Sequence, residues 1–178
     1  QSGSYTVVVT ANSLSTTSDA TTVTVNSKPT TPSPTSNSPL CAGSVLNLST
    51  ASVTNATYAW SGPNGYTANT RTPSRTNITT AMAGTYSVTT TVNGCTSSPG
   101  TVAVTINTIP STPSVTSPVS YEQNQTSSPL SASGTNLLWY TSATSGTGSS
   151  TAPTPSTTTI GTFNHYVSQT INSCESSR

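Results

Sequence analysis

The sequence predicts an all-β fold built from tandem β-sandwich repeats of about 80 residues each. Three observations predict it. Only 4% of the residues are charged while roughly two in five are Ser or Thr, β-branched and apolar residues alternate in short runs, and several landmarks recur at a constant spacing. Thr suits a pleated strand with its hydroxyl toward water, so such a chain can form sheets with hydroxylated outer faces. A disordered chain normally has high net charge and few β-branched residues, whereas the net charge here is +1.

The repeat is visible at three kinds of landmark. They are a tyrosine strand (Gly3-Ser4-Tyr5-Thr6-Val7, Gly84-Thr85-Tyr86-Ser87-Val88 and, more weakly, Asn164-His165-Tyr166-Val167-Ser168), a proline-rich joint beginning at Pro29 and again at Pro110, and a tryptophan, Trp60 and Trp139. All three kinds give the same period to within two positions. A repeat of this size, with short alternating strands, is typical of a small sandwich module of the immunoglobulin kind.

This period divides the chain into three predicted modules. Residues 1–28 are the C-terminal strands of a preceding immunoglobulin-like module, 29–108 a complete module, and 109–178 a module that lacks its last strand. An incomplete sandwich leaves an unpaired strand edge. We therefore expect both end modules to be completed, either by further residues of the same long chain or by a strand from a neighbouring copy.

Alternating patterns place the strands of these modules. Residues 85–106 are predicted to form two antiparallel strands joined by a longer hairpin, with Tyr86, Val88, Thr90 and Val92 on one face. Residues 5–9 and 22–25 are the corresponding strands of the first segment. No window has helical periodicity with caps, so essentially no α-helix is expected. The prolines of residues 28–34 and 109–113 predict short, semi-extended connectors.

Charged side chains are too few for several kinds of partner. The four cationic residues, Lys28, Arg71, Arg75 and Arg178, form no basic stripe, so nucleic-acid binding is not expected. No apolar run approaches the roughly 20 residues needed to cross a bilayer, so membrane insertion is not expected either. The chain does not begin like a signal peptide, and we expect a soluble segment whose export signal lies elsewhere.

Three cysteines predict one structural disulfide and one thiol whose partner lies elsewhere. Cys41 precedes the strand at Val45 and Cys95 lies in the hairpin after the Tyr86 strand, so a Cys41–Cys95 disulfide would tie the start of the module to the sheet that carries its end. Closing a loop of about fifty residues stabilises a module by roughly 3 to 4 kcal/mol in the chain-entropy picture. A reactive thiol would need a neighbouring cation, and none is close in sequence.

Five aromatic residues are predicted to lie in module cores: Trp60, Trp139, Tyr5, Tyr86 and Tyr166. For Trp60 this is the position of the core tryptophan of the third strand in many such sandwiches. The alternative is a sugar-stacking platform made of Trp60, Tyr58 and Tyr66, which nothing else in the sequence supports.

Catalytic and metal-binding chemistry is not predicted. His165 is the only histidine, and Asp19, Glu122 and Glu175 are the only acids, spread over three modules. A Ser–His–Asp site needs a base held by a carboxylate, glycoside hydrolysis needs two facing carboxylates, and calcium sites need clustered acids. We therefore expect no enzyme activity, no cofactor and no metal, with His165 on the surface.

Two stretches resemble known surface-protein modules. The run of residues 138–178, which begins Leu138-Trp139-Tyr140, resembles immunoglobulin-like modules of very large Bacteroidota surface proteins, near their gliding-motility-associated C-terminal regions. Residues 40–106, with the runs LCAGS, YAWSGPNGY, AGTYSV and NGC, resemble the PKD-like or immunoglobulin-like modules that accompany them. The resemblance implies cell-surface or secreted proteins exported by the type nine secretion route, many of them adhesins. Such modules carry a cysteine near Tyr121-Glu122 that would pair with Cys174, so the resemblance implies that Cys174 is unpaired here.

The sequence thus predicts a structural segment of an extracellular surface protein, forming an extended rod or fibre with an adhesive or spacer role. Its partners would be neighbouring immunoglobulin-like modules of the same chain or of adjacent copies. The alternative is a binding module whose exposed loops hold glycans or other cells.

Overall fold

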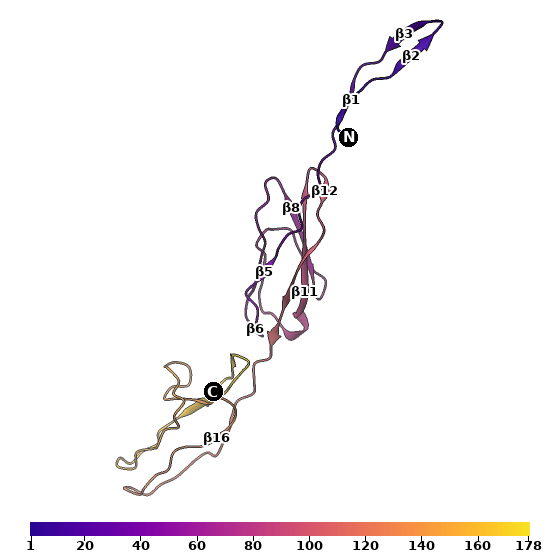
Figure 1. Cartoon of the computed structure of the whole chain (residues 1–178). Coiled ribbons are helices and arrows are strands. Elements are labelled where there is room, and N and C mark those ends of the chain that lie inside the picture. The colour runs from indigo at the N-terminus through magenta and orange to yellow at the C-terminus, as the bar shows by residue number, and fades with distance from the viewer. The chain divides into compact units, whose positions relative to one another are not determined.

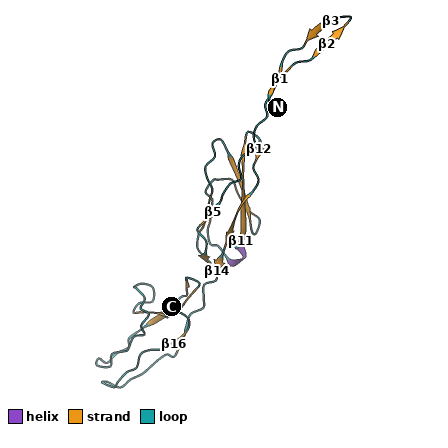
Figure 2. Cartoon of the chain, in the orientation of Figure 1, coloured by secondary structure: helices purple, strands orange, loops and turns teal.

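The computed structural model describes residues 1–178, which form short strands and turns throughout (Figures 1 and 2). The strands of residues 1–28 are β1 (Gly3–Tyr5), β2 (Val8–Ala11), β3 (Leu14–Thr17) and β4 (Thr21–Val23). Those of residues 29–108 are β5 (Thr35–Ser36), β6 (Leu40–Cys41), β7 (Leu46–Ser49), β8 (Thr57–Gly62), β9 (Tyr66–Ala68), β10 (Ser74–Arg75), β11 (Gly84–Val92), β12 (Cys95–Thr96), β13 (Gly100–Val104) and β14 (Ile106–Asn107). Those of residues 109–178 are β15 (Ser114–Val115), β16 (Ala132–Ser133), β17 (Leu138–Tyr140), β18 (Tyr166–Ser168), β19 (Thr170–Ile171) and β20 (Cys174–Glu175).

The predicted all-β class is confirmed. The only helix is the 3₁₀ turn η1 (Thr80–Met82), and no helix is long and apolar enough to cross a membrane. Contacts divide the chain into two compact units, the first made of Gln1–Thr35, Ser49–Pro73 and Tyr86–Val102, the second of Ser36–Leu48, Ser74–Thr85 and Ala103–Arg178. We call residues 1–28, 29–108 and 109–178 the N-terminal, central and C-terminal segments; the central segment is shared between the units.

The sheet of the first unit is organised around β11, which pairs with β8, β12 and β13, while β9 extends it beyond β8. Tyr86, Val88 and Thr90 alternate with more exposed residues along β11, as the sequence predicts. Tyr86 is fully buried and meets Tyr66 edge to face, with ring centroids 5.4 Å apart. A side chain at Gly62 would lie 2.5 Å from the Tyr86 ring, so the ring packs directly on the backbone there.

The second unit contains two further sheets of the central segment. In one, β7 lies between β5 and β10; in the other, β6 pairs with β14 in parallel. The two-residue alternation of β7 buries Leu46 and Leu48 on one face, and Ile78 and Ile106 are buried in the same unit. Buried apolar faces on both sets of strands are what a β-sandwich requires.

The N-terminal segment forms two ribbons, β1 with β4 and β2 with β3. Every residue from Gln1 to Lys28 is exposed. Two-stranded ribbons cannot bury a face by themselves, so this segment has strands of the predicted kind without a core of its own.

The C-terminal segment is also made of two-stranded ladders, which are β15 with β16, β17 with β18, and β19 with β20. Unlike the N-terminal segment it buries side chains, among them Trp139, Tyr140 and Val167. Long loops without regular structure connect its strands, including residues 141–165 between β17 and β18.

One hairpin recurs in all three segments. Its turn residues have left-handed φ angles, which is the signature of a type I′ turn: Asn12-Ser13, Asn93-Gly94 and Asn172-Ser173. The flanking residue pairs are Ala11↔Leu14, Val92↔Cys95 and Ile171↔Cys174. In each hairpin a serine hydroxyl accepts a hydrogen bond from an N–H of the opposite strand and donates to a nearby carbonyl: Ser18, Ser97 and Ser176. The hairpin after Tyr86 is therefore tighter than the longer one predicted.

Candidate functional site

The structure corrects the predicted cysteine pairing. Cys41 is bonded to Cys174, with their Cα atoms 5.6 Å apart, and Cys95 is a free, half-buried thiol. The predicted Cys41–Cys95 disulfide and the predicted unpaired Cys174 are therefore both wrong in this structure. The bond spans 133 residues of sequence and links the central segment to the C-terminal segment within the second unit.

The division of the chain into two units explains the error. Cys41 and Cys174 both lie in the second unit, whereas Cys95 lies in the first. A disulfide needs Cα atoms within about 7 Å of each other. Cys41 and Cys95 bracket the module in sequence, but that position does not place them in the same unit.

The disulfide belongs to a larger joint between the two segments, here called the second joint. It consists of β6 and β14 on the central side and the β19–β20 hairpin on the C-terminal side. Beside the disulfide, the side-chain amide of Asn107 donates to the carbonyl of Asn172 at 3.1 Å, and the Sγ of Cys41 lies 3.6 Å from the carbonyl oxygen of Ser173. The turn of the hairpin is thus held both covalently and by a hydrogen bond to the end of β14.

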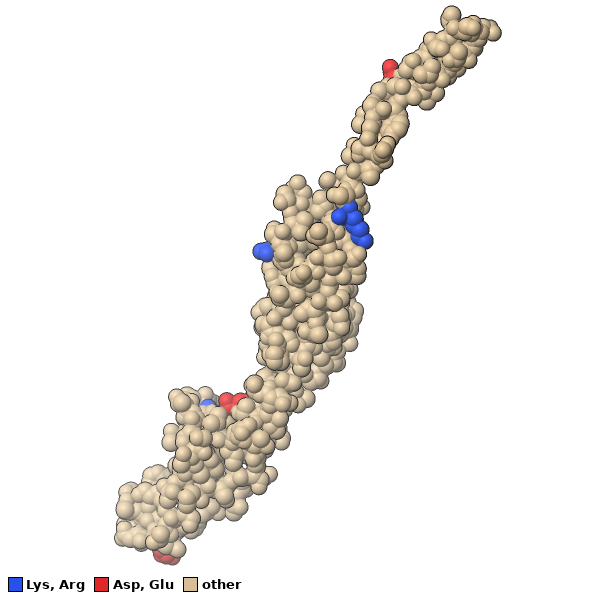
Figure 3. Space-filling view, viewed as in Figure 1, with Lys and Arg blue, Asp and Glu red and all other residues tan.

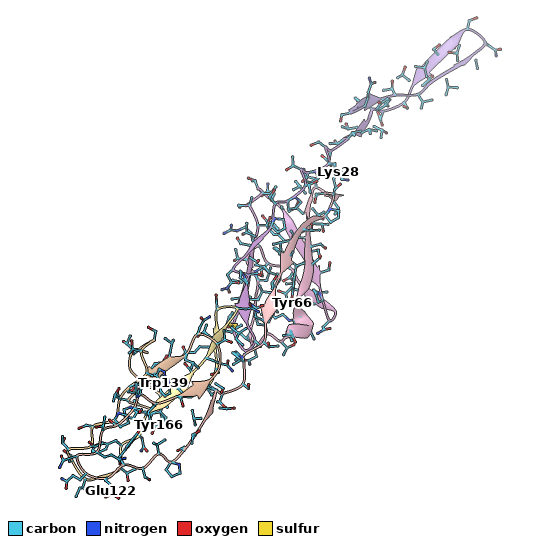
Figure 4. The ribbon with its side chains drawn as sticks, turned by 60° about the horizontal axis from the view of Figure 1, so that its bottom comes forward. Lys28, Tyr66, Glu122, Trp139 and Tyr166 are labelled. Atoms are coloured by element: carbon cyan, nitrogen blue, oxygen red, sulfur yellow. A yellow bond between two sulfur atoms is a disulfide. The ribbon has the colours of Figure 1, made fainter.

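A similar joint lies in the first unit, between the end of the N-terminal segment and the β11–β12 hairpin; we call it the first joint. The side-chain amide of Asn26 approaches the carbonyl of Asn93 at 3.4 Å, and the Cys95 Sγ lies 3.8 Å from the carbonyl oxygen of Asn26. The Nζ of Lys28, labelled in Figure 4, donates to the Ser98 hydroxyl at 3.0 Å. This joint has hydrogen bonds but no covalent link.

The first connector also packs on the sheet that follows it. A side chain at Gly100, on β13, would overlap the Pro32 carbonyl oxygen and lie 2.9 Å from the Pro34 ring. The connector backbone therefore requires a glycine there. The predicted proline-rich connector is in contact with the module and is not a free tether.

The predicted core aromatics differ in their surroundings. Trp60, Trp139 and Tyr86 are buried, and the Trp60 indole N–H donates to the Thr70 carbonyl at 2.9 Å. Tyr166, shown beside Trp139 in Figure 4, is half-buried. Tyr5 is half exposed, contrary to its predicted core position, because no other strands cover the N-terminal ribbons.

Glu175, next to Cys174, is held by a small polar cluster that the sequence did not reveal. Its carboxylate accepts hydrogen bonds from the Ser168 and Tyr140 hydroxyls, both at 2.6 Å. These two bonds lower the pKa of Glu175, partial burial opposes them, and the nearby Arg178 contributes a smaller lowering. The Arg178 guanidinium lies over the Tyr140 ring, 3.3 Å from its centroid. The cluster attaches Glu175 and Arg178 to Tyr140 on β17.

The remaining acids and the histidine occupy scattered positions. Asp19 and Glu122 are exposed in different segments, and His165 is half-buried just before β18. No group of three or more His, Cys, Asp or Glu residues is arranged to hold a metal ion. The two joints are therefore the candidate functional sites of the molecule.

Comparison with known proteins adds little to this geometry. No protein-family model matches the sequence, and no curated protein is similar to it. Among solved structures, the chain is similar to the amphioxus IgVJ-C2 molecule, with 22% sequence identity and a TM-score of 0.38. The similarity covers 56% of this chain and 57% of that one, so the chain spans little more than half of the structure it matches.

Proposed function

We propose that this chain is a structural segment of an extracellular surface protein, in which successive immunoglobulin-like modules form a stiff spacer or fibre with adhesive use. The observation that carries the proposal is the Cys41–Cys174 disulfide, because it joins two segments instead of closing one. A staple of this kind restrains the angle between neighbouring modules. A module that only bound a ligand would not need its neighbour attached in this way.

The chemistry of the chain supports an extracellular location. Disulfides form and persist in oxidising compartments and are rare in the cytosol. Charged groups are few and scattered over the surface in Figure 3. The exposed faces of strands such as β11 and β3 carry Thr and Ser hydroxyls. Hydroxyls solvate a sheet without introducing charge repulsion between neighbouring copies.

The disulfide also has a mechanical consequence. When the chain is pulled from its two ends, force passes through the Cys41–Cys174 bond, and the 133 residues between them are shielded from extension. At about 3.5 Å per residue this withholds about 470 Å of contour length. Nearly all of the central and C-terminal segments would therefore stay folded under load.

Single-molecule pulling of the oxidised chain tests this. Reduction should release about 470 Å of additional extension, Cys41→Ser should release the same length without reduction, and Cys95→Ser should leave the oxidised behaviour unchanged. Negative-stain images of the native material should show straight particles. Equal extension of oxidised and reduced chains, or coiled and compact native particles, would contradict a structural role.

A binding role is the second candidate, supported by one observation. The loop of residues 141–165 exposes Ile160 and Phe163, which are 82% and 59% accessible. Trp60 cannot serve as a sugar-stacking platform, because its ring is buried. A glycan-array screen in which binding is lost in Phe163→Ala would favour this candidate. An array without specific signals would count against it and leave the structural role as the one candidate.

A further inference from the structure

The two joints are built from equivalent residues of the repeat. Asn107 occupies the position of Asn26 one repeat later, and Asn172 likewise occupies the position of Asn93. In each joint the side-chain amide of the first asparagine approaches the carbonyl of the second. Cys95 and Cys174 lie at the same position of their hairpins. The first joint is thus a second example of the arrangement that carries the disulfide.

The joints differ in one element. In the second joint, Cys41 lies on β6, and β6 pairs in parallel with β14 so that Cys41 is opposite Asn107. In the first joint, Asn26 takes the place of Asn107, but no strand lies beside it. Cys95 is present on the hairpin without the cysteine that would face it.

The N-terminal segment exposes apolar side chains of the kind that another sheet normally buries. Four apolar residues of the N-terminal segment are exposed although their equivalents in the central segment are buried. The pairs, with exposed fractions, are Tyr5 50% and Tyr86 0%, Val7 64% and Val88 0%, Val23 42% and Val104 3%, and Val25 60% and Ile106 6%. The side chains of the shared pattern are therefore buried in the central segment and exposed in the N-terminal segment.

We propose that Cys95 is the site of a second inter-module disulfide, formed with a cysteine in the position of Cys41 on a strand that pairs in parallel with Val25 and Asn26. That strand belongs to the front half of an immunoglobulin-like module with the pattern of residues 29–83, whose other strands cover the exposed face. This deepens the proposed function, on which it rests only in treating the repeats as tandem modules. The Cys41 of a second copy is not available, because Cys174 holds it and β14 pairs with its strand.

The reaction is ordinary thiol oxidation. The two thiols lose two protons and two electrons to a small-molecule disulfide such as oxidised glutathione, which is reduced to two thiols. Cys95 attacks as the thiolate, and a mixed disulfide with the small molecule is the intermediate. Cys95 is a free thiol on a half-buried residue.

The remaining positions of the repeat follow the same rule, in which a front cysteine pairs with the hairpin cysteine of the next module. The hairpin position of the N-terminal segment holds Leu14, and the front position of the C-terminal segment, equivalent to Cys41, holds Glu122. The rule therefore requires no bond from either position. It also explains why Cys174 is paired although Glu122 is not a cysteine.

The test is an extended chain in which a copy of residues 29–83 precedes Gly3–Arg178, since Gly3 is the repeat equivalent of Gly84. After oxidation in a glutathione buffer, peptide mapping should find the added copy of Cys41 bonded to Cys95, with the original Cys41–Cys174 bond retained and no free thiol. Cys95→Ser in the same chain should leave the added cysteine free. An intact original bond with Cys95 still free would overturn the proposal.

A second measurement does not depend on whether the extended chain folds. The chain of residues 1–178 is mixed, in the same buffer, with a peptide of residues 38–46 or with a scrambled peptide that keeps its cysteine in place. The mixed disulfide at Cys95 should form several-fold more with the native peptide, and Asn26→Ala should reduce the preference. Equal capture of both peptides would overturn the proposal. Neither readout depends on mechanical behaviour, so failure here is separate from failure of the spacer role.

Discussion

Residues 3–25 and 84–106 align without a gap in the repeat, yet they exist in opposite environments. In the central segment the shared pattern lines a core, with Tyr86 fully buried; in the N-terminal segment Tyr5 is half exposed on a two-stranded ribbon. The two segments form the same turn. Each hairpin also has a serine that accepts a hydrogen bond from the opposite strand, Ser18 and Ser97, although the two serines occupy different positions of the repeat. Local sequence is therefore enough to form the hairpin, and burial depends on strands supplied from elsewhere.

The largest expected effect comes from the covalent difference between the two joints. Cys41→Ser removes a bond that closes a loop of 133 residues, which should lower the free energy of unfolding by about 5 kcal/mol. Cys95→Ser, at the equivalent hairpin position without a bond, should change it by less than about 0.5 kcal/mol. Urea unfolding followed by tryptophan fluorescence measures both. Similar losses in the two variants would mean that the joints are energetically alike.

The repeat-equivalent tyrosines, Tyr5 and Tyr86, test the contribution of burial directly. Tyr86→Ala should cost about 3 to 5 kcal/mol, because it leaves a cavity against Gly62 and Tyr66. Tyr5→Ala should cost less than about 1 kcal/mol in the same chain. In the extended chain with the added residues 29–83, the cost of Tyr5→Ala should rise toward that of Tyr86→Ala. An unchanged small cost there would show that the added strands do not cover the N-terminal face.

Thr90 is a buried polar residue whose repeat equivalent in the exposed N-terminal segment is apolar. Its hydroxyl is buried without a hydrogen-bond partner, whereas the equivalent residue of the N-terminal segment is Val9. Thr90→Val keeps the shape and removes the unsatisfied hydroxyl, so it should raise the free energy of unfolding by about 1 kcal/mol. Thr91→Val is the control, because the Thr91 hydroxyl already bonds to Thr96 on the exposed face. Destabilisation by Thr90→Val would show that the buried hydroxyl has a partner.

The smallest effect concerns the third hairpin. Its cross-strand pair is Thr170 and Glu175, where the other hairpins have bonded hydroxyl pairs. The lowered pKa of Glu175 means that the folded state prefers the ionised carboxylate. Its stabilisation is full above the ordinary pKa of 4.5 and is lost as the pH falls through the lowered value.

Glu175→Gln should therefore reduce stability at pH 7 by about 0.5 kcal/mol, discounted because the group is exposed to solvent. The difference from the parent chain should vanish at low pH, as measured by thermal unfolding across the pH range. A difference that is the same at pH 3 and pH 7 would show that the charge of Glu175 does not contribute.

Much of the architecture was predictable, because it depends on short-range rules. The alternation of Tyr86, Val88 and Thr90 specified one buried face of a strand, and Thr- and Val-rich runs without helical periodicity specified an all-β chain. The Asn-Gly pair at residues 93 and 94 is a strong hairpin signal. What the sequence left hidden were contacts between segments, such as Asn26 with Asn93, and contacts between distant strands, such as Tyr140 with Glu175.

The sequence by itself determined the period, the hairpins and which side chains suit a core. Each of these depends on residues that are close together in the chain or on a spacing that repeats. The tertiary structure alone decided the partner of each cysteine. The repeat places Cys95 and Cys174 in the same position, so either could pair with Cys41 by pattern. The structure selects Cys174, which lies in the same unit as Cys41, because a disulfide depends on distance in space and not on position in the sequence.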